Sequence, residues 1–292
     1  MTTSQPGILR PIALAGRYVT LALAPGASAR ALLGRLAELR IDESVVVGLG
    51  EPLARAVGAT IPGLHTFPAL SGPGCAVPST QAALFVHTRA GDHGDALHLM
   101  RRVLAALGDG VRIEDDVVAY KHDTGRDLSG YEDGTENPRD QAAIDAAVVA
   151  GAGAGLDGAS FVAVQRWVHD LAALDRLEAA ARDRLIGRNR ESNVELEDAP
   201  ASAHVRRSAQ ESFDPPAFMV RRSMPYGTVH EHGLYFVAYV AALSAFERMM
   251  RRMAGLDDGV VDGVFGFSRP VSGGYYWCPP VEGERLDLRA LT

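Results

Sequence analysis

Apolar and polar residues in the first half of the chain follow two alternating periodicities. Short runs rich in β-branched and aromatic residues predict strands over 17–24, 43–50, 82–88 and 112–121. Between them, apolar residues recur at the spacing of a helix. A helix is expected over 28–39, where four leucines share one face, and a second over 92–107. The first half therefore predicts a mixture of strands and amphipathic helices.

The second half repeats this pattern. Strands are expected over 161–168 and 217–224, and a helix over 170–188. The segment 233–255 predicts one long helix with two apolar faces, which is typical of a helix buried between layers. Strands mixed with helices in two similar halves indicate an α+β fold, with two antiparallel sheets that are each faced by helices.

A glycine-rich segment, GAGAGLDGA at 151–159, separates the two halves. Its composition is typical of a connection between domains, so the expected domains are 1–150 and 151–292. The segment also contains a formal GxGxxG, but it precedes a strand instead of joining a strand to a helix. This context excludes the dinucleotide-binding interpretation.

Composition narrows the class of protein. The chain has 292 residues, 47% hydrophobic and 22% charged, and a net charge of -7, which argues against a general nucleic-acid binder. We see no secretory signal and no apolar run of roughly 18 residues. The two cysteines, Cys75 and Cys278, are far apart and outside any CxxC spacing, so no disulfide framework is expected. The expectation is a cytoplasmic protein without nucleic-acid or membrane partners.

The densest candidate for chemistry is GYEDGTENP at 130–138. Glycine, aspartate, asparagine and proline all favour turns, so a surface turn is one interpretation. A calcium loop is excluded, because Pro138 stands where the sharp turn needs glycine and Ile144 where the bidentate glutamate is needed. In the remaining interpretation, two glycines fix the backbone so that Asp133 projects into a cavity.

Two further clusters have both an ordinary and a functional interpretation. His204 in PASAHVRR is either a solvated histidine or a ligand, and an arginine beside it would suit a carboxylate such as a heme propionate. Arg221 in RRSMPYG is either an exposed strand end or a fixed charge that stabilises negative charge in a pocket. The HEH at 230–232 lacks the spacing of a metalloprotease motif.

These segments, in this order, resemble the dye-decolourising peroxidase family, and more closely its intracellular bacterial (B-type) branch. The family's GxxDG stands here as residues 130–134, followed by TENP. The similarity runs from about Val77 to Pro280, and it includes WVHDL (167–171), IGRNRESNVEL (186–196), the His204 segment, RRSMPYG (221–227), HGLYF (232–236) and PVSGGYYWCPP (270–280).

The resemblance implies two ferredoxin-like antiparallel sheet/helix sandwiches of the dimeric α/β barrel type. The half at 1–150 would carry the distal GxxDG loop, and the half at 151–292 would hold heme b. The implied activity is a heme peroxidase that reduces hydrogen peroxide and oxidises dyes, phenolic or other bulky reductants through a high-valent heme, in a homo-oligomer. The alternatives are a heme-handling protein with incidental peroxidase activity, and a scaffold without heme.

The resemblance also implies a role for individual residues. His204 corresponds to the axial ligand of the heme iron, and Asp262 to the carboxylate behind it. The other correspondences are Asp133 and Arg221 as the catalytic distal pair, Ser223 as their auxiliary hydrogen bonder, Arg207 at a heme propionate, Leu234 and Phe236 on the distal heme face, and Glu132 and Gly134 beside Asp133 in the cofactor-binding loop. Many relatives have asparagine where Ser223 stands, and serine where Ala203 stands.

Two expectations concern residues outside these motifs. Trp167 and Trp277 could relay electrons from a bulky reductant, but ordinary core packing is the expectation for each of them. The tail VEGERLDLRALT at 281–292 is short and charged, and a solvated end is expected.

Overall fold

The computed structural model describes residues 2–292. The first half contains β1 (Ala15–Leu23), α1 (Ala29–Ala37), β2 (Val45–Leu49), α2 (Glu51–Ala56), β3 (Leu70–Gly72), β4 (Cys75–Val77), β5 (Leu84–Ala90), α3 (His93–Leu107), β6 (Val111–Tyr120) and α4 (Asp140–Ala147). The second half contains β7 (Ser160–His169), α5 (Leu171–Asp175), α6 (Ala179–Ile186), α7 (His204–Arg207), β8 (Val220–Arg221), β9 (Met224–Gly227), β10 (His232–Val240), α8 (Leu243–Met253), β11 (Ser268–Pro270), β12 (Gly274–Cys278), β13 (Val281–Glu282) and β14 (Arg285–Leu286).

Antiparallel pairing joins the main strands into a 10-stranded sheet in the order β11-β7-β12-β2-β5-β1-β6-β9-β10-β8. Because β10 also pairs with β7 over the whole length from Gly233 to Val240, the sheet closes into a barrel. Two seams join the halves through single bridges, Leu49 to Trp277 and Ala119 to Tyr226. The α+β class with antiparallel pairing is confirmed. The sheets expected of the two halves are joined into one, and closure pairs edge strands that would otherwise stay open.

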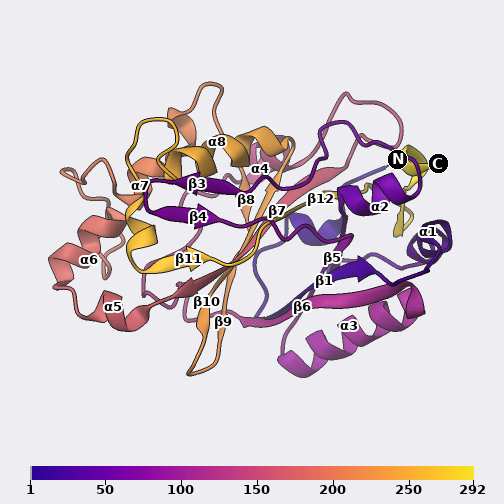
Figure 1. Cartoon of the computed structure of the whole chain (residues 1–292), viewed down its shortest axis with the longest axis horizontal. Helices are drawn as coiled ribbons and strands as arrows, with labels where there is room; N and C mark the ends of the chain where they lie inside the picture. The colour runs from indigo at the N-terminus through magenta and orange to yellow at the C-terminus, as the bar shows by residue number, and fades with distance from the viewer. Residues whose placement is uncertain (1) are drawn as a thin grey trace.

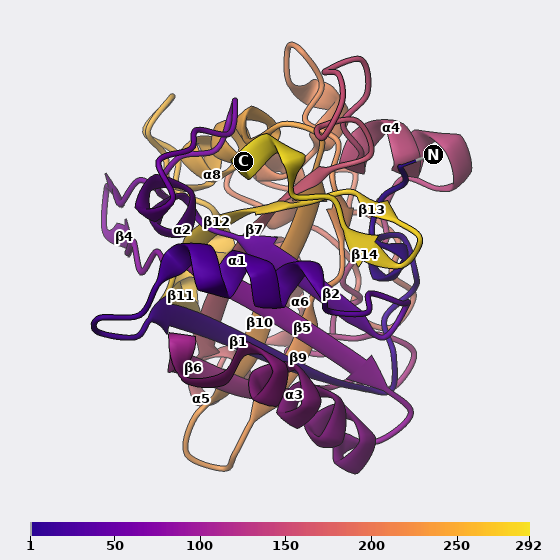
Figure 2. The same ribbon diagram turned by 90° about the vertical axis from the view of Figure 1, so that its right-hand side faces the viewer.

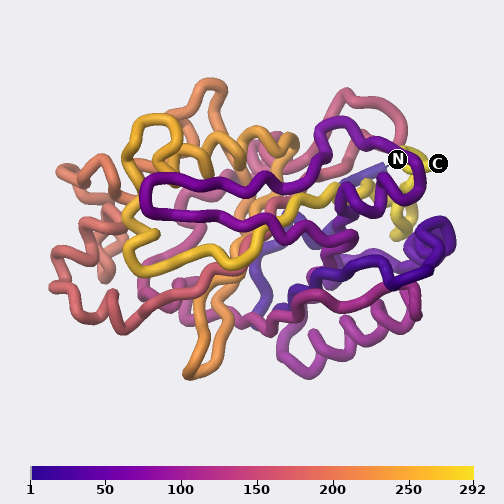
Figure 3. The backbone as a smooth tube through the Cα atoms, viewed as in Figure 1, coloured from indigo at the N-terminus to yellow at the C-terminus, as the bar shows by residue number. Residues whose placement is uncertain are grey.

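The helices cover the outside of the barrel. Figure 2 shows α1 and α3 over the sheet of the first half, and α8 lies along the other half, against β7 and β10 (Figure 1). The barrel interior is filled by side chains from both halves, including Tyr18, Phe85, Val162, Tyr235 and Tyr276. The tube in Figure 3 shows both termini at the same end of the molecule, and Figure 2 shows them apart across that end.

Several expected elements have different bounds. The predicted helix over 233–255 is wrong, since β10 occupies its first part and only α8 is helical. GLYFVAYV is rich in aromatic and β-branched residues, and Ala242 keeps an extended backbone (φ -147°, ψ 134°), so the helix begins at Leu243. The expected helix over 170–188 is two short helices, α5 and α6, and the strand over 217–224 is divided into β8 and β9.

The C-terminal tail returns to the first half. Val281 pairs with Thr3, the amide of Ile41 donates to the carbonyl of Glu284, and Leu288 and Leu291 are buried. The expectation of a solvated end is therefore wrong, because Leu286, Leu288 and Leu291 of the tail are buried in the core. Trp167 and Trp277 are buried, which confirms core packing, and both cysteines are free. None of the helices within residues 2–292 is long and apolar enough to cross a membrane.

Candidate active site

A large cavity, called here the main cavity, lies outside the barrel between strands β7 and β10 and helices α7 and α8. It holds about 1570 Å³ of empty space, part of it open to solvent. Its apolar wall includes Leu234 and Phe236 of β10 and Phe246, Met249 and Met253 of α8. Polar residues from the loops around 127–136 and 188–211 complete it. An apolar space with a few convergent polar groups is typical of a cofactor site.

His204 is the first residue of α7 and lines the main cavity. Its Nδ1 lies 2.8 Å from Oδ2 of Asp262, whose other oxygen accepts the amide of Val264 at 2.9 Å. Burial alone would lower the pKa of His204, but the buried Asp262 carboxylate outweighs it and raises that pKa. A carboxylate on Nδ1 assigns the proton to Nδ1 and leaves the Nε2 lone pair for a ligand. The structure therefore brings His204 and Asp262 together in the arrangement of a metal-ligating histidine.

Asp133 and Arg221 also line the main cavity, from different parts of the chain. Oδ1 of Asp133 lies 3.5 Å from Nη1 of Arg221, and the two side chains are 21% and 13% exposed. Nε of Arg221 is buried and has no hydrogen-bond partner among residues 2–292. A carboxylate beside a fixed positive charge, both facing a largely apolar space, can move a proton and stabilise negative charge there.

Asn137 links the loop that carries Asp133 to the backbone of Arg221. Its Oδ1 accepts the amide of Arg221 at 2.7 Å, and its Nδ2 donates to the carbonyl of Arg221 at 3.1 Å. Only glycine at position 134 leaves room for the Asn137 side chain, since a Cβ there would lie 2.6 Å from Nδ2 of Asn137. The φ of Gly134 is +76°, which also favours glycine. Asn137 was not among the site residues expected from the sequence. Its place in the TENP extension of GxxDG was the signal that could have identified it.

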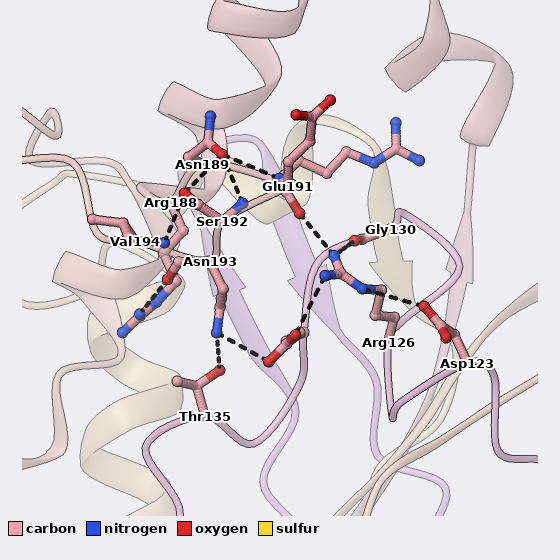
Figure 4. A network of polar contacts seen from close by, with 12 residues as sticks. Asp123, Arg126, Gly130, Thr135, Arg188, Asn189, Glu191, Ser192, Asn193 and Val194 are labelled. Carbon is pink, nitrogen blue, oxygen red and sulfur yellow. Dashed lines mark hydrogen bonds and ion pairs between the residues drawn. The ribbon is translucent and has the colours of Figure 1, made fainter.

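Hydrogen bonds connect the loop that carries Asp133 to the segment 188–194 (Figure 4). Nη1 of Arg126 donates to the carbonyls of Gly130 and Arg190, each at 2.7 Å. Nδ2 of Asn193 donates to Oε2 of Glu132 at 3.0 Å and also contacts Oγ1 of Thr135. A side chain at Gly130 (φ +89°) would collide with the guanidinium of Arg190. Glu132 lines the cavity, as expected of a residue in the cofactor-binding loop, but its carboxylate is already engaged by Arg126 and Asn193.

Two predicted site residues lie elsewhere. Arg207 is buried and does not line the main cavity, since its guanidinium forms two hydrogen bonds with Asp258, at 2.6 and 2.7 Å, and one with the carbonyl of Arg252. Ser223 does not line it either, because its Oγ accepts the amide of Val237 at 3.3 Å. The expected propionate and distal roles of these two residues do not agree with this geometry.

Two other arginines, Arg188 and Arg206, line the main cavity. Arg188 is held by the carbonyl of Asn193 at 3.0 Å and by Glu136 at 2.7 Å, and Arg206 donates to the carbonyl of Glu197 at 3.2 Å. Both cations are positioned to meet a carboxylate group of a molecule in the cavity. Arg188 belongs to the IGR of a segment singled out in the sequence, but its role was not identified there.

A buried polar cluster in the cavity wall was also missed. His169 contacts Oγ of Ser268 at 2.7 Å through Nδ1 and Oδ2 of Asp127 at 3.0 Å through Nε2. Oδ1 of Asp127 accepts the amide and the hydroxyl of Ser129. Burial alone would raise the pKa of Asp127, but the hydrogen bonds from His169 and Ser129 lower it. His169 belongs to the WVHDL segment, which was the available signal.

Comparison with known proteins gives a consistent result for both halves of the chain. The family model described as Dyp-type peroxidase, N-terminal, matches residues 37–121, and the model described as Dyp-type peroxidase, C-terminal, matches residues 124–283. The chain is 35% identical over 225 residues to the dye-decolorizing peroxidase of Mycobacterium tuberculosis, covering 75% of this chain and 67% of the relative. It is 33% identical over 291 residues to the dye-decolorizing peroxidase of Brevibacterium linens, covering 93% and 79%.

Solved structures show the same likeness. A dye-decolorizing protein from V. cholerae superimposes with a TM-score of 0.84 at 30% identity, covering 94% of this chain and 97% of that chain. A variant of DypB from Rhodococcus jostii RHA1, in complex with heme, gives a TM-score of 0.84 at 30% identity, covering 93% and 94%.

Proposed function

The chain belongs to the Dyp-type peroxidase family, and on that premise we propose that His204 binds the iron of heme in the main cavity while Asp133 and Arg221 act on hydrogen peroxide. The protein is a heme-dependent peroxidase, with hydrogen peroxide and a reductant as substrates. The observation that carries the residue assignment is the convergence of His204, backed by Asp262, with the Asp133–Arg221 pair on one cavity.

The residues of the main cavity fit heme by their chemistry. Asp262 holds the His204 imidazole in the tautomer whose Nε2 is free to ligate iron. Leu234, Phe236 and the α8 residues supply an apolar wall for a macrocycle. We propose that Arg188 and Arg206, in place of Arg207, meet the propionates through charge-assisted hydrogen bonds.

Heme held through Nε2 of His204 would supply a redox-active iron that reacts with peroxide. The Asp133 carboxylate would accept a proton from hydrogen peroxide and donate it to the oxygen that leaves as water. Such acid–base help is typically worth about 10²–10⁴-fold in rate. The Arg221 guanidinium would stabilise the negative charge that develops as the O–O bond breaks, a contribution of about 3 kcal/mol for one well-placed donor.

The test is rapid mixing of the heme-loaded protein with stoichiometric peroxide, followed in the Soret band. We expect Arg221→Leu to slow the spectral change about 10²–10³-fold while heme content stays normal. Asp133→Ala is expected to slow it by about 10²-fold or more.

The matched control is Arg35→Leu. The Arg35 guanidinium does not line the main cavity, and it donates to the carbonyl of Leu107 and to Asp109, so its loss affects stability and not the peroxide step. An equally slow reaction in the wild type, Asp133→Ala and Arg221→Leu would contradict the assignment and favour a heme-handling role.

We also infer that each half is a ferredoxin-like unit, with the boundary between 1–150 and 151–292. In support, the main strands follow each other in the chain as β1, β2, β5, β6 in one half and β7, β9, β10, β12 in the other. In the sheet, both sets have the same order, second-third-first-fourth: β2-β5-β1-β6 and β9-β10-β7-β12. Single bridges join the halves at both seams. A cytoplasmic location and a homo-oligomer stay predictions from the sequence, and light scattering on the purified protein tests the second.

A further inference from the structure

The loop that carries Asp133 is anchored to strand β7 by a buried hydrogen bond. The segment 126–132 turns back on itself as a short hairpin: its two ends form a β-bridge, and the amide of Asp127 donates to the carbonyl of Tyr131 at 2.9 Å. Asp133 follows as the next residue. The Tyr131 hydroxyl donates to Asp183 at 2.7 Å, which anchors one arm of the hairpin. The other arm depends on the carboxylate of Asp127.

This carboxylate uses both of its oxygens. Oδ1 of Asp127 accepts the amide of Ser129 at 2.9 Å and also the hydroxyl of Ser129, which fixes the turn of the hairpin. Oδ2 lies 3.0 Å from Nε2 of His169, the last residue of β7. Asp127 and His169 both line the main cavity. The carboxylate therefore joins the hairpin to a strand in the wall of that cavity.

The ring of His169 is also fixed from its other side. Its Nδ1 lies 2.7 Å from Oγ of Ser268, which is paired with His169 in the register of β11 and β7. A carboxylate beside Nε2 assigns the proton to Nε2, so Nδ1 accepts the hydroxyl of Ser268. Both ring nitrogens are engaged, so His169 offers no lone pair to a metal, in contrast to His204.

The His169–Asp127 contact is more buried than the ion pair across the ends of the hairpin. The side chains of His169 and Asp127 are 4% and 12% exposed, whereas those of Arg126 and Glu132 are 20% and 36% exposed. Water competes less with a hydrogen bond at a buried site, and a buried carboxylate that loses its partner is strongly destabilised. The contact with His169 therefore restrains the hairpin more strongly than the Arg126–Glu132 pair does.

We propose that His169 is a positioning residue for the peroxide step. It holds Asp127 and thereby fixes the hairpin 126–132. The hairpin in turn keeps the Asp133 carboxylate 3.5 Å from Arg221. This proposal rests on the proposed function, and His169 itself neither touches peroxide nor moves a proton in it. A reacting group has to be held within about 0.5 Å of its working position, and a displacement of about 1 Å can slow a reaction about 10²-fold.

The first experiment compares two amide substitutions of His169 in the heme-loaded protein. A glutamine carries its N–H group about as far from the backbone as Nε2 of histidine, so His169→Gln can still donate to Asp127. An asparagine is shorter, so His169→Asn loses that bond. We expect His169→Asn to react with stoichiometric peroxide about 10–100-fold more slowly than the wild type, and His169→Gln at close to the wild-type rate. Similar rates in the two variants would overturn the proposal, because the bond to Asp127 would then have no part in the step.

A second measurement reports on the base without turnover. Hydrogen cyanide, like hydrogen peroxide, gives up a proton as it binds, so its rate of association with the ferric protein depends on Asp133. We expect this rate to fall about tenfold or more in His169→Asn and to return in His169→Gln. The matched control is His98→Asn, since His98 lies on α3 and does not line the main cavity. A normal cyanide rate beside a slow peroxide reaction in His169→Asn would contradict a role through Asp133.

Ser268→Ala tests the proposal if His169→Asn does not fold. It removes only the hydroxyl that orients the His169 ring, and we expect the peroxide and cyanide rates both to fall about threefold or more. Unchanged rates in Ser268→Ala would then overturn the proposal. Asp133→Ala tests the proposed function separately: if this variant reacts with peroxide and cyanide as fast as the wild type, Asp133 is not the base, whatever the His169 variants do.

Discussion

The two hydrogen bonds between Asn137 and the backbone of Arg221 lead to a specific prediction for Asn137→Ala. The substitution leaves the amide and carbonyl of Arg221 without their partners, at 2.7 and 3.1 Å. A buried backbone group that loses its partner costs about 1–3 kcal/mol, so we expect unfolding of the heme-free protein to be easier by about 2–4 kcal/mol. Arg221 should also lose its fixed position, and misplacing a charged group by about 1 Å can slow a reaction about 10²-fold.

The assay is the Soret change on mixing with stoichiometric peroxide, in a double-mutant cycle with Arg221→Leu. If Asn137 acts through Arg221, Asn137→Ala slows the wild type strongly but slows the Arg221→Leu protein little, since the group it positions is already gone. Asn137→Asp keeps the acceptor for the Arg221 amide, so its rate should lie between those of the wild type and Asn137→Ala. Rate losses that simply multiply in the double variant would refute this reasoning.

Three further predictions follow from the site. Asp262→Asn should speed heme loss about 10–100-fold, measured by transfer to a heme acceptor, because the ligand His204 loses a charged partner; an unchanged rate would contradict this. Arg207→Gln should lower the free energy of unfolding of the heme-free protein by about 1–2 kcal/mol in urea, because its two hydrogen bonds with Asp258 are lost. If the variant instead binds heme more weakly and is as stable as the wild type, Arg207 contacts a heme propionate. The pKa of Asp127 is lowered in the fold, so its carboxylate stabilises the protein above the unfolded pKa of about 3.9 and this contribution is lost as pH falls through the folded value. Asp127→Asn should therefore flatten the pH dependence of unfolding between about pH 5 and 3, and an identical slope in both proteins would argue against the contribution.

The elements that the sequence predicted well are those with a strong local period. The apolar spacing over 92–107 corresponds to α3, and the β-branched runs correspond to β1, β2, β5, β6 and β7 within a few residues. The prediction failed at 233–255, where an apolar run contains both a strand and a helix. A strand and a helix are both compatible with such a run. Pairing with β7 makes the first part of the run, β10, a strand.

For the site, the ordered segments identified Asp133, His204 and Arg221, and the structure places all three on one cavity. Residue identity did not reveal what each arginine contacts. Arg207 and Arg188 are both arginines near predicted site segments, but Arg207 pairs with Asp258 and only Arg188 lines the cavity. The direction of a long side chain depends on the partner that packing provides, which a local pattern does not contain.

By itself, the sequence determined most of the strands and helices of the first half, the family and the chemical types available for catalysis. Only the tertiary structure decided that the sheet closes into one barrel, that Asn137 holds Arg221 across 84 residues, and that Asp262 holds His204 across 58. Local propensity acts over one or two turns of chain, whereas these contacts form only when segments distant in sequence are packed together. The contact of His169 with Asp127 across 42 residues exists for the same reason: a strand sets which side chains alternate, and the fold sets what each face meets.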